Sequence, residues 1–334
     1  MIRVAIDAMG GDHAPAAPVA GAALALAEVG DDVVVQLVGR SAAIEAELAS
    51  QGVARTRIEV VEAPETVGMG DKPLQAVRTK RQSSIAVGLT LQRDGRSDAF
   101  ISAGNTGAVM AASTLILRLY PGFERPAIGI PFPTVGKPVL VLDGGANVDC
   151  SPQELVGFAH LGVLYARDVM DRSAPAVGLL NIGEEEEKGN AATKEAHRLL
   201  AASGLSFVGN IEGRDIVLGS CDRGPFDVVV CDGFVGNVLL KFYESTGKLF
   251  HRLVDRELGA ELAHGAAMQR IWRVLDYAEY GGAPLLGVRG VSIVCHGRSS
   301  PEAQRAAVKV AIEAARHHLV QHMTSEFLPG GAAS

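Results

Sequence analysis

The sequence predicts an α/β protein built on a doubly wound, mostly parallel sheet. Short runs of Val, Ile and Leu alternate with helix-like stretches over most of the 334 residues. Such continuous apolar runs are typical of parallel strands that are buried on both faces. Aromatic residues make up only 5 % of the chain, whereas it contains 39 glycines. Small aliphatic side chains and many glycine turns suit α/β layering better than an aromatic-rich sandwich.

The apolar runs are the expected strands, and helix-like stretches separate most of them. Right-handed crossovers between parallel strands would build an open, doubly wound sheet. The expected strands are 4–6, 33–38, 58–61, 98–102, 127–131, 139–142, 177–180, 227–231 and 291–295.

Proline and serine residues mark several expected helix starts. These helices cover 15–29, a segment opened by Lys72-Pro73 after Asp71, 152–170 and 301–322. Between 236 and 278 apolar residues recur every three or four positions without a strand, which indicates a helical excursion divided at Gly259 and Gly265. We expect a single α/β unit over 1–328 that includes this excursion, followed by a disordered tail at 329–334.

Composition excludes several classes of protein. The 31 Lys and Arg against 38 Asp and Glu give a net charge of −7, which disfavours binding to a nucleic-acid backbone. A strand from the second residue leaves no room for a targeting leader, and the uncharged stretches are shorter than the ~20 residues of a membrane span. The four cysteines have no metal-binding spacing, so we expect buried thiols in a reducing cytosol.

Ligands of doubly wound sheets bind beyond the carboxyl ends of the strands, so the loops there are the candidate site. The first loop contains Gly10 and Gly11, which let the backbone approach an anion; alternatively it is a plain turn with Asp7 and Asp12 as caps. The loop 102–107 combines small residues, hydroxyls and an amide before a helix, and we expect it to cradle phosphate.

Two further loops carry charged residues. Asp143 and Asp149 flank a glycine turn, where either could orient a cation or a substrate hydroxyl, or could cap the next helix. Four glutamates at 184–187 suit the start of a helix, whereas a cation there works against the helix dipole. We therefore expect Lys188 to face an anionic substrate.

The remaining loops contain Arg214, Asp232, Asn237 and His296. A histidine can act as an acid or base near neutral pH, although a lone loop histidine is more often structural. The chain has no GxSxG, HExxH, Walker A or GxGxxG motif. The residues alone thus indicate an enzyme that handles a phosphate or a polycarboxylate without a covalent nucleophile.

In this order, the loops resemble the bacterial acyl-ACP:phosphate acyltransferase (PlsX) family of fatty acid and phospholipid synthesis. Each motif is weak alone, but nine in the family's order, followed by His296-Gly297, are specific. The matching segments are 7–12, 72–84, 102–110, 125–128, 145–150, 181–190, 212–215, 232–237 and 280–287.

The resemblance implies a fold similar to isocitrate and isopropylmalate dehydrogenases and to phosphotransacetylases, a homodimer, and no cofactor. It implies transfer of a fatty acyl group from acyl carrier protein to inorganic phosphate. The acyl phosphate would serve an integral-membrane glycerol-3-phosphate acyltransferase, so the enzyme would be cytoplasmic and peripherally bound to the inner face of the membrane. A phosphotransacetylase-like enzyme or a decarboxylating dehydrogenase on the same fold, and a non-catalytic scaffold, are the alternatives.

Phosphate is itself an anionic nucleophile, which agrees with the missing nucleophile motif. Under the resemblance, Lys188 would bind phosphate, Asn237 would stabilise the tetrahedral oxyanion, and His296 would protonate the departing thiolate. No metal is expected. The wider phosphate- and substrate-binding set is Asp7, Gly10, Gly11, Ser102, Gly104, Asn105, Thr106, Gly107, Asn147, Arg214 and Asp232.

Two surfaces would serve partners. Acyl carrier protein is acidic, so we expect it to bind a local basic patch formed by Arg78, Lys80 and Arg81; the alternative is a solvated helix face.

In the helical excursion, apolar residues flanked by cations resemble a helix that lies on anionic lipid, with Trp272 beside it. A dimer helix and a core helix are the other interpretations. The apolar set is Leu249, Phe250, Leu253 and Val254.

Overall fold

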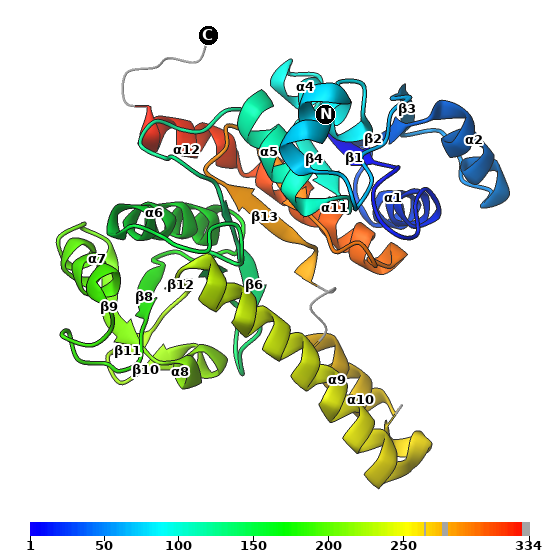
Figure 1. Ribbon diagram of the computed structural model, residues 1–334. Coiled ribbons are helices and arrows are strands. Elements are labelled where there is room, and N and C mark those ends of the chain that lie inside the picture. Colours follow the sequence, from blue (N-terminus) through cyan, green and yellow to red (C-terminus); the bar gives the residue numbers. More distant parts are fainter. Residues whose placement is uncertain (264, 276–279, 329–334) are drawn as a thin grey trace. The chain divides into compact units, whose positions relative to one another are not determined.

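The computed structural model describes residues 1–263, 265–275 and 280–328, and the chain forms two compact units (Figure 1). Unit 1 contains residues 1–126, 168–171 and 281 onward; unit 2 contains 127–167 and 172–280. That the two units act as one catalytic unit stays a prediction. The tail expected at 329–334 lies outside the described residues, as do 264 and 276–278 of the helical excursion.

Unit 1 is built on a sheet in which β3, β2, β1, β4, β14 and β13 are neighbours in that order. All of these pairs are parallel except β13–β14. Ile6 pairs with Leu37 on one side and Ile101 on the other, which places β1 in the core. The strands are β1 (Ile2–Asp7), β2 (Val33–Gly39), β3 (Ile58–Glu62), β4 (Ala99–Ser102), β13 (Ala283–Leu286) and β14 (Val291–Val294).

Helix starts in unit 1 follow the predicted signals. Pro301 occupies the first turn of α11, and the Ser300 hydroxyl accepts a hydrogen bond from the Ala303 N–H. The single helix expected over 301–322 is wrong, because His318 adopts a left-handed conformation between α11 and α12. The helices are α1 (Ala16–Glu28), α2 (Ser41–Ser50), α3 (Pro73–Thr79), α4 (Ser84–Arg93), α5 (Thr106–Ile116), α11 (Pro301–Arg316) and α12 (Leu319–Phe327).

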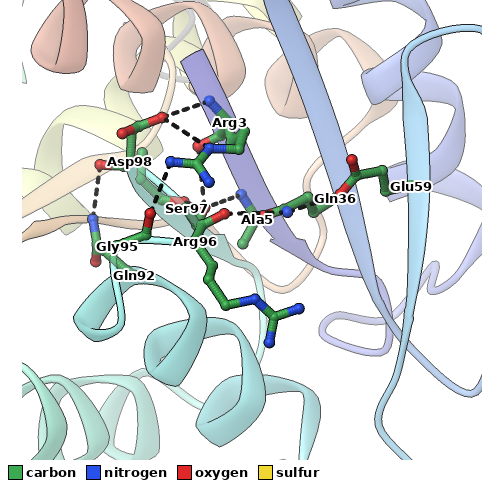
Figure 2. Close-up of polar contacts among 10 residues, drawn as sticks. Arg3, Ala5, Gln36, Glu59, Gln92, Gly95, Arg96, Ser97 and Asp98 are labelled. Carbon is green, nitrogen blue, oxygen red and sulfur yellow. Dashed lines mark hydrogen bonds and ion pairs between the residues drawn. The ribbon is translucent and has the colours of Figure 1, made fainter. Parts of the chain in front are cut away.

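A polar network holds the amino-terminal edge of the unit 1 sheet, opposite the candidate site (Figure 2). The Arg3 N–H donates to Asp98 Oδ2 at 2.7 Å, and the Ser97 hydroxyl bridges the backbone of β1 by accepting from Ala5 N–H and donating to Arg3 O. Gln36 donates to Glu59 at 2.9 Å. These bonds fix β1 beside β4, so the carboxyl ends of both strands reach the same edge.

Unit 2 has a sheet of five strands in the order β6-β7-β12-β8-β9, parallel except for β6–β7. The mostly parallel α/β class is therefore confirmed. Four strands, β9, β10, β11 and β13, were not predicted from the sequence. Of these, β9 contains Ser206, Gly209 and Asn210 rather than a continuous apolar run. The strands are β5 (Ala127–Ile128), β6 (Ile130–Phe132), β7 (Val139–Leu142), β8 (Ala176–Leu180), β9 (Ser206–Ile211) and β12 (Val228–Val230), with a hairpin of β10 (Ser220–Cys221) and β11 (Gly224–Pro225).

The helical excursion forms two helices, α9 and α10, that lie side by side and extend away from the sheet of unit 2 (Figure 1). The predicted division is present: Gly259 has φ 74° inside α9, and α10 begins just after Gly265. The helices of unit 2 are α6 (Pro152–Asp168, whose last residue groups with unit 1), α7 (Ala191–Ala201), α8 (Gly213–Leu218), α9 (Gly233–Ala263) and α10 (Ala266–Leu275).

Candidate active site

In unit 1, Asp7 and Ser102 end neighbouring strands and contact each other. The Ser102 hydroxyl donates to Asp7 Oδ2 at 2.7 Å, and the Met9 N–H donates to Oδ1 at 3.0 Å. Burial raises the pKa of Asp7, while hydrogen bonds from Ser84, Ser102 and the backbone oppose this shift. Both carboxylate oxygens are used within the fold, so Asp7 shapes the loop at this edge.

The predicted glycines let the loops after β1 and β4 approach each other closely. A Cβ on Gly10 would collide with Asp7 Oδ2 and lie 2.7 Å from the Gly104 nitrogen. Gly11 has φ +99°, a conformation that favours glycine. The next N–H, that of Asp12, donates to the carbonyl of Gly297 at 2.7 Å, which brings the loop after β14 to the same edge.

The start of α5 is a capped helix terminus, which corrects part of the predicted phosphate cradle. Asn105 Oδ1 accepts from the Ala108 N–H at 3.1 Å, and its Nδ2 donates to the carbonyl of Met69. The Asn105 amide is therefore committed to structure. Gly107 packs against Pro73 of α3, where a Cβ would lie 2.7 Å from the proline ring, whereas Thr106 is exposed.

His296 is exposed at the carboxyl edge of β14. Its Nδ1 accepts from the Arg298 N–H at 3.2 Å, which leaves the proton of the neutral ring on Nε2. The neighbouring Arg298 lies 3.8 Å from Asp12, and both side chains are exposed. The ring can thus present an N–H donor to a ligand at this edge.

The predicted basic patch is smaller than expected. Arg78, at the end of α3, and Arg81 are exposed. Lys80 is half-buried and pairs with Asp71 at 2.5 Å, and this contact lowers the pKa of that carboxyl. Lys80 therefore contributes little charge to a partner surface.

In unit 2, Asp143 organises the loop after β7. Its Oδ2 accepts from the Asn147 N–H at 2.7 Å and from Asn147 Nδ2 at 2.9 Å. Its Oδ1 accepts from the N–H groups of Ile128, Gly145 and Ala146. Asp143 is fully buried and Asn147 is 3 % exposed. Asp143 thus does not cap the next helix, α6, which begins at Pro152; it orders the loop after β7, and the Asn147 side chain serves the same loop.

Asp232 and Asn237 come from the start of α9, next to this loop. Asp232 Oδ1 accepts from the Val235 N–H at 2.8 Å and thereby caps the helix. A Cβ on Gly236 would overlap the carbonyl oxygen of Asp143, so glycine permits the close packing there. Asn237 is exposed, and its Cβ would lie 3.2 Å from a Cβ on Gly145. The Asn237 side chain thus borders the loop after β7.

Lys188 lies on the loop between β8 and α7, and not at a helix start as predicted. The glutamates at 184–187 do not open a helix, because α7 begins at Ala191 and Asn190 caps it. Lys188 Nζ is 4.0 Å from Glu185 Oε2, and both side chains are about half exposed, so this ion pair contributes little. The ammonium group of Lys188 can therefore reach a ligand at the carboxyl edge of β8.

Arg214 is surrounded by carboxylates. Its guanidinium lies 3.2 Å from Glu184, 3.2 Å from Glu212 and 3.8 Å from Asp215. The Coulombic effect of Glu212 and the hydrogen bond to Glu184 raise the pKa of Arg214. Three acids offset its charge, so Arg214 ties the loops after β8 and β9 together and is poorly suited to hold phosphate in this structure.

The apolar face of α9 is exposed in part. Leu249 is 58 % exposed, Phe250 47 % and Leu253 37 %, whereas Val254 is buried and would not reach a lipid surface. Trp272 of α10 stacks on His251 and lies edge-on to Phe250, so it packs against α9. No helix in the described parts of the chain is long and apolar enough to cross a membrane.

Comparison with known proteins decides the family. The model of the fatty acid synthesis protein family matches residues 2–322. A phosphate acyltransferase from Nostoc punctiforme is 46 % identical and covers 98 % of this chain and 97 % of its own length. Another from Desulforamulus reducens is 47 % identical and covers 96 % of each chain. The chain belongs to the phosphate acyltransferase family. It is an acyltransferase of fatty acid synthesis.

Solved structures confirm the predicted likeness of this phosphate acyltransferase fold to phosphotransacetylases. A phosphotransacetylase from Streptococcus pyogenes superposes with a TM-score of 0.64 at 16 % identity, covering 95 % of this chain and 94 % of its own. A branched-chain phosphotransacylase from Enterococcus faecalis gives 0.61 at 15 % identity, covering 95 % and 100 %. These identities show a common fold and no more.

The cysteines of this family member agree with acyl transfer without a thiol nucleophile. Burial raises the pKa of Cys150 and of Cys295 to about 12 and that of Cys231 well above its usual value. These three thiols stay protonated at neutral pH and are weak nucleophiles. The expectation of four buried thiols is wrong for Cys150 and Cys221, which are half-buried. Among the described residues, no group of three or more His, Cys, Asp or Glu could hold a metal ion.

Several residues that order the loops of this phosphate acyltransferase were not predicted from the sequence. Ser84 of α4 supports Asp7, His197 of α7 contacts Asn210 at the end of β9, and Arg223 of the β10–β11 hairpin donates to the loop after β8. His197 follows Ala196 and precedes Leu200 on the buried face of α7, so its position on an apolar stripe was an available signal. Ser84 and Arg223 have no comparable local signal.

Proposed function

We propose that the enzyme transfers a fatty acyl group from acyl carrier protein to inorganic phosphate and releases acyl phosphate for phospholipid synthesis. The observation that carries this proposal is the 46–47 % identity to phosphate acyltransferases over nearly the whole chain, combined with glycine-containing loops at the carboxyl edges of strands in both units. Phosphate attacks the thioester carbon, the tetrahedral intermediate collapses, and the carrier-protein thiolate leaves. No residue needs to form a covalent acyl intermediate.

Within unit 2, we assign Lys188 to phosphate and Asn237 to the oxyanion. An exposed ammonium group offsets the negative charge of the nucleophile, and an amide donor that borders the loop after β7 stabilises the developing oxyanion. Within unit 1, we assign protonation of the thiolate to His296, whose Nε2 carries the available proton. The glycine loops at 10–11 and 104–107 remain proposed anion-binding backbone.

Phosphate-dependent release of carrier-protein thiol tests the reaction directly. Incubation with palmitoyl carrier protein should release free thiol only when phosphate is present, and hydroxylamine should trap the product as palmitoyl hydroxamate. Sulfate in place of phosphate is the matched control, because it should not support release. Thiol release that is independent of phosphate, or release without hydroxamate, would contradict the proposed reaction.

We infer that the acidic carrier protein docks at Arg78 and Arg81, because these two cations are exposed whereas Lys80 is paired. Replacing Arg78 with Glu should raise KM for the acyl carrier protein about tenfold and flatten its rise with added salt, because the change replaces an attraction that salt screens with a repulsion. Kinetics at about 20 and 200 mM salt, where the Debye length is roughly 20 Å and roughly 7 Å, provide the measurement. Arg55→Glu, at an exposed arginine elsewhere in unit 1, is the control. An equal response of both variants would place the docking surface elsewhere.

We also infer that the exposed residues Leu249, Phe250 and Leu253 of α9 contact anionic lipid, with a homodimer as the companion assembly. Lys248, Arg252 and Arg256 flank them, which suits an anionic surface. Leu253→Glu should remove binding in flotation with vesicles of anionic phospholipid, while gel filtration should show an unchanged dimer. Loss of the dimer instead would assign this face to the second copy of the chain. Such peripheral contact would place the enzyme at the cytoplasmic face of the membrane, next to the integral-membrane glycerol-3-phosphate acyltransferase that would use its product.

A further inference from the structure

A buried side chain of the neighbouring strand, β9, hydrogen-bonds to the loop that carries Lys188. Asn210, at the end of β9, is fully buried, and its Nδ2 donates to the carbonyl oxygen of Glu185 at 2.7 Å. The same carbonyl accepts from the Lys188 N–H at 3.1 Å. One acceptor therefore links the backbone of Lys188 to the rigid sheet of unit 2.

A histidine fixes the orientation of that amide. Because Asn210 Nδ2 donates to Glu185, its Oδ1 faces His197 Nδ1 at 3.0 Å, and this nitrogen must carry the proton. His197 is 9 % exposed and packs edge-on against Phe207. The buried chain His197–Asn210–Glu185 is directional, because reversing the amide would place Asn210 Oδ1 against the carbonyl oxygen of Glu185, where neither atom can donate.

Arg223 holds the same loop from the edge of the sheet. Its guanidinium donates to the carbonyl oxygens of Val208 and Asn210 and, at 3.4 Å, to that of Glu184. Gly209 between them has φ +91°, and a Cβ there would lie 3.0 Å from Arg223 Cζ. The pairing of β8 with β9 shifts register at this position. The glycine irregularity makes room for the guanidinium, which bridges β9 to the start of the Lys188 loop.

We propose that His197, Asn210 and Arg223 are positioning residues that hold Lys188 in place for phosphate. This inference rests on the proposed role of Lys188 in the function above. None of the three needs to touch substrate; each acts through the backbone of 184–188. A lysine on a four-carbon stem offers charge at a fixed point only if its Cα is fixed, and small displacements cost rate steeply.

A double-mutant cycle measures whether His197, which acts on the loop through Asn210, contributes through Lys188. His197→Leu removes the donor to Asn210 and should raise KM for phosphate about tenfold, with kcat changed less than threefold. In the Lys188→Ala background, His197→Leu should change kcat/KM less than twofold, because the positioned group is gone. His197→Asn places an amide donor near the position of Nδ1 and should restore most of the phosphate affinity.

Arg223→Met repeats the cycle at an exposed site where folding is expected to survive, which matters if His197→Leu proves unstable. We expect a five- to tenfold rise in KM for phosphate that disappears in the Lys188→Ala background. Arg198→Met is the matched control: Arg198 is adjacent to His197 in sequence but pairs with Glu195 at the surface, so its kinetics should be normal.

The outcomes separate the inference from the function on which it rests. Effects of His197→Leu and Arg223→Met that persist undiminished in the Lys188→Ala background overturn the inference. Normal kinetics of folded His197→Leu and Arg223→Met, together with impaired kinetics of Lys188→Ala, would also overturn the inference. If Lys188→Ala has normal kinetics, the inference and the role of Lys188 both fall, yet phosphate-dependent hydroxamate formation would still support the proposed reaction.

Discussion

Replacing Lys188 with Ala is expected to lower kcat/KM for phosphate by roughly 10²- to 10³-fold, the usual cost of removing one preorganised charge stabiliser. The melting temperature should change little, because the side chain is 45 % exposed and the acid that pairs with it, Glu185, lies 4.0 Å away. Phosphate-dependent thiol release measures kcat/KM, and a thermal melt of the same preparation measures the melting temperature.

Lys194→Ala is the control for this prediction. Lys194 is an exposed lysine on α7, a few residues along the same segment, so the two variants remove the same charge from the same part of unit 2. Equal kinetics of the two variants would remove Lys188 from the proposed phosphate site.

Replacing Asp143 with Asn is expected to lower the free energy of unfolding by about 2–6 kcal/mol. Each carboxylate oxygen accepts at least two N–H groups in a buried loop, so an amide NH₂ in either position faces donors and leaves at least two of them unsatisfied. Each such loss costs ~1–3 kcal/mol. The midpoint of urea unfolding, with hydrogen exchange of the β7 amides, is the measurement.

Asp222→Asn controls for the loss of one negative charge in unit 2, because Asp222 is exposed in the β10–β11 hairpin. We expect its free energy of unfolding to stay within about 0.5 kcal/mol of the wild-type value, as for ordinary surface substitutions, so its urea midpoint should change little. Matching midpoints for the two variants would mean that Asp143 does not organise the loop.

Local sequence signals predicted the elements well where burial is strong and symmetric. Parallel strands such as β7 and β12 are short valine- and leucine-rich runs buried on both faces, and their pattern is visible without any neighbour. Helix starts at Pro73, Pro152 and Pro301 follow from the fixed backbone of proline. In contrast, β9 contains a glycine and polar residues that make sense only beside Arg223 and His197.

The candidate site could likewise be predicted only in part. The positions of the loops could be predicted, because a strand followed by glycines and a helix start is a local pattern. The chemical state of each side chain could not. Asn105, Asp143 and Arg214 each have the residue type of a ligand-binding group, yet their partners come from segments up to about forty residues away, and those partners already satisfy them.

Composition and local pattern are thus sufficient for the fold class, for the order of the loops and for the identity of residues that can bind an anion. Which of those residues remain available depends on contacts between distant segments. Lys188 shows the difference most clearly: its helix-start rationale was wrong, and its place on an exposed loop anchored through Glu185 to Asn210 is set by long-range hydrogen bonds. Hydrogen-bond satisfaction is a property of the packed structure, because a polar group acquires its partner only when the chain brings the two together.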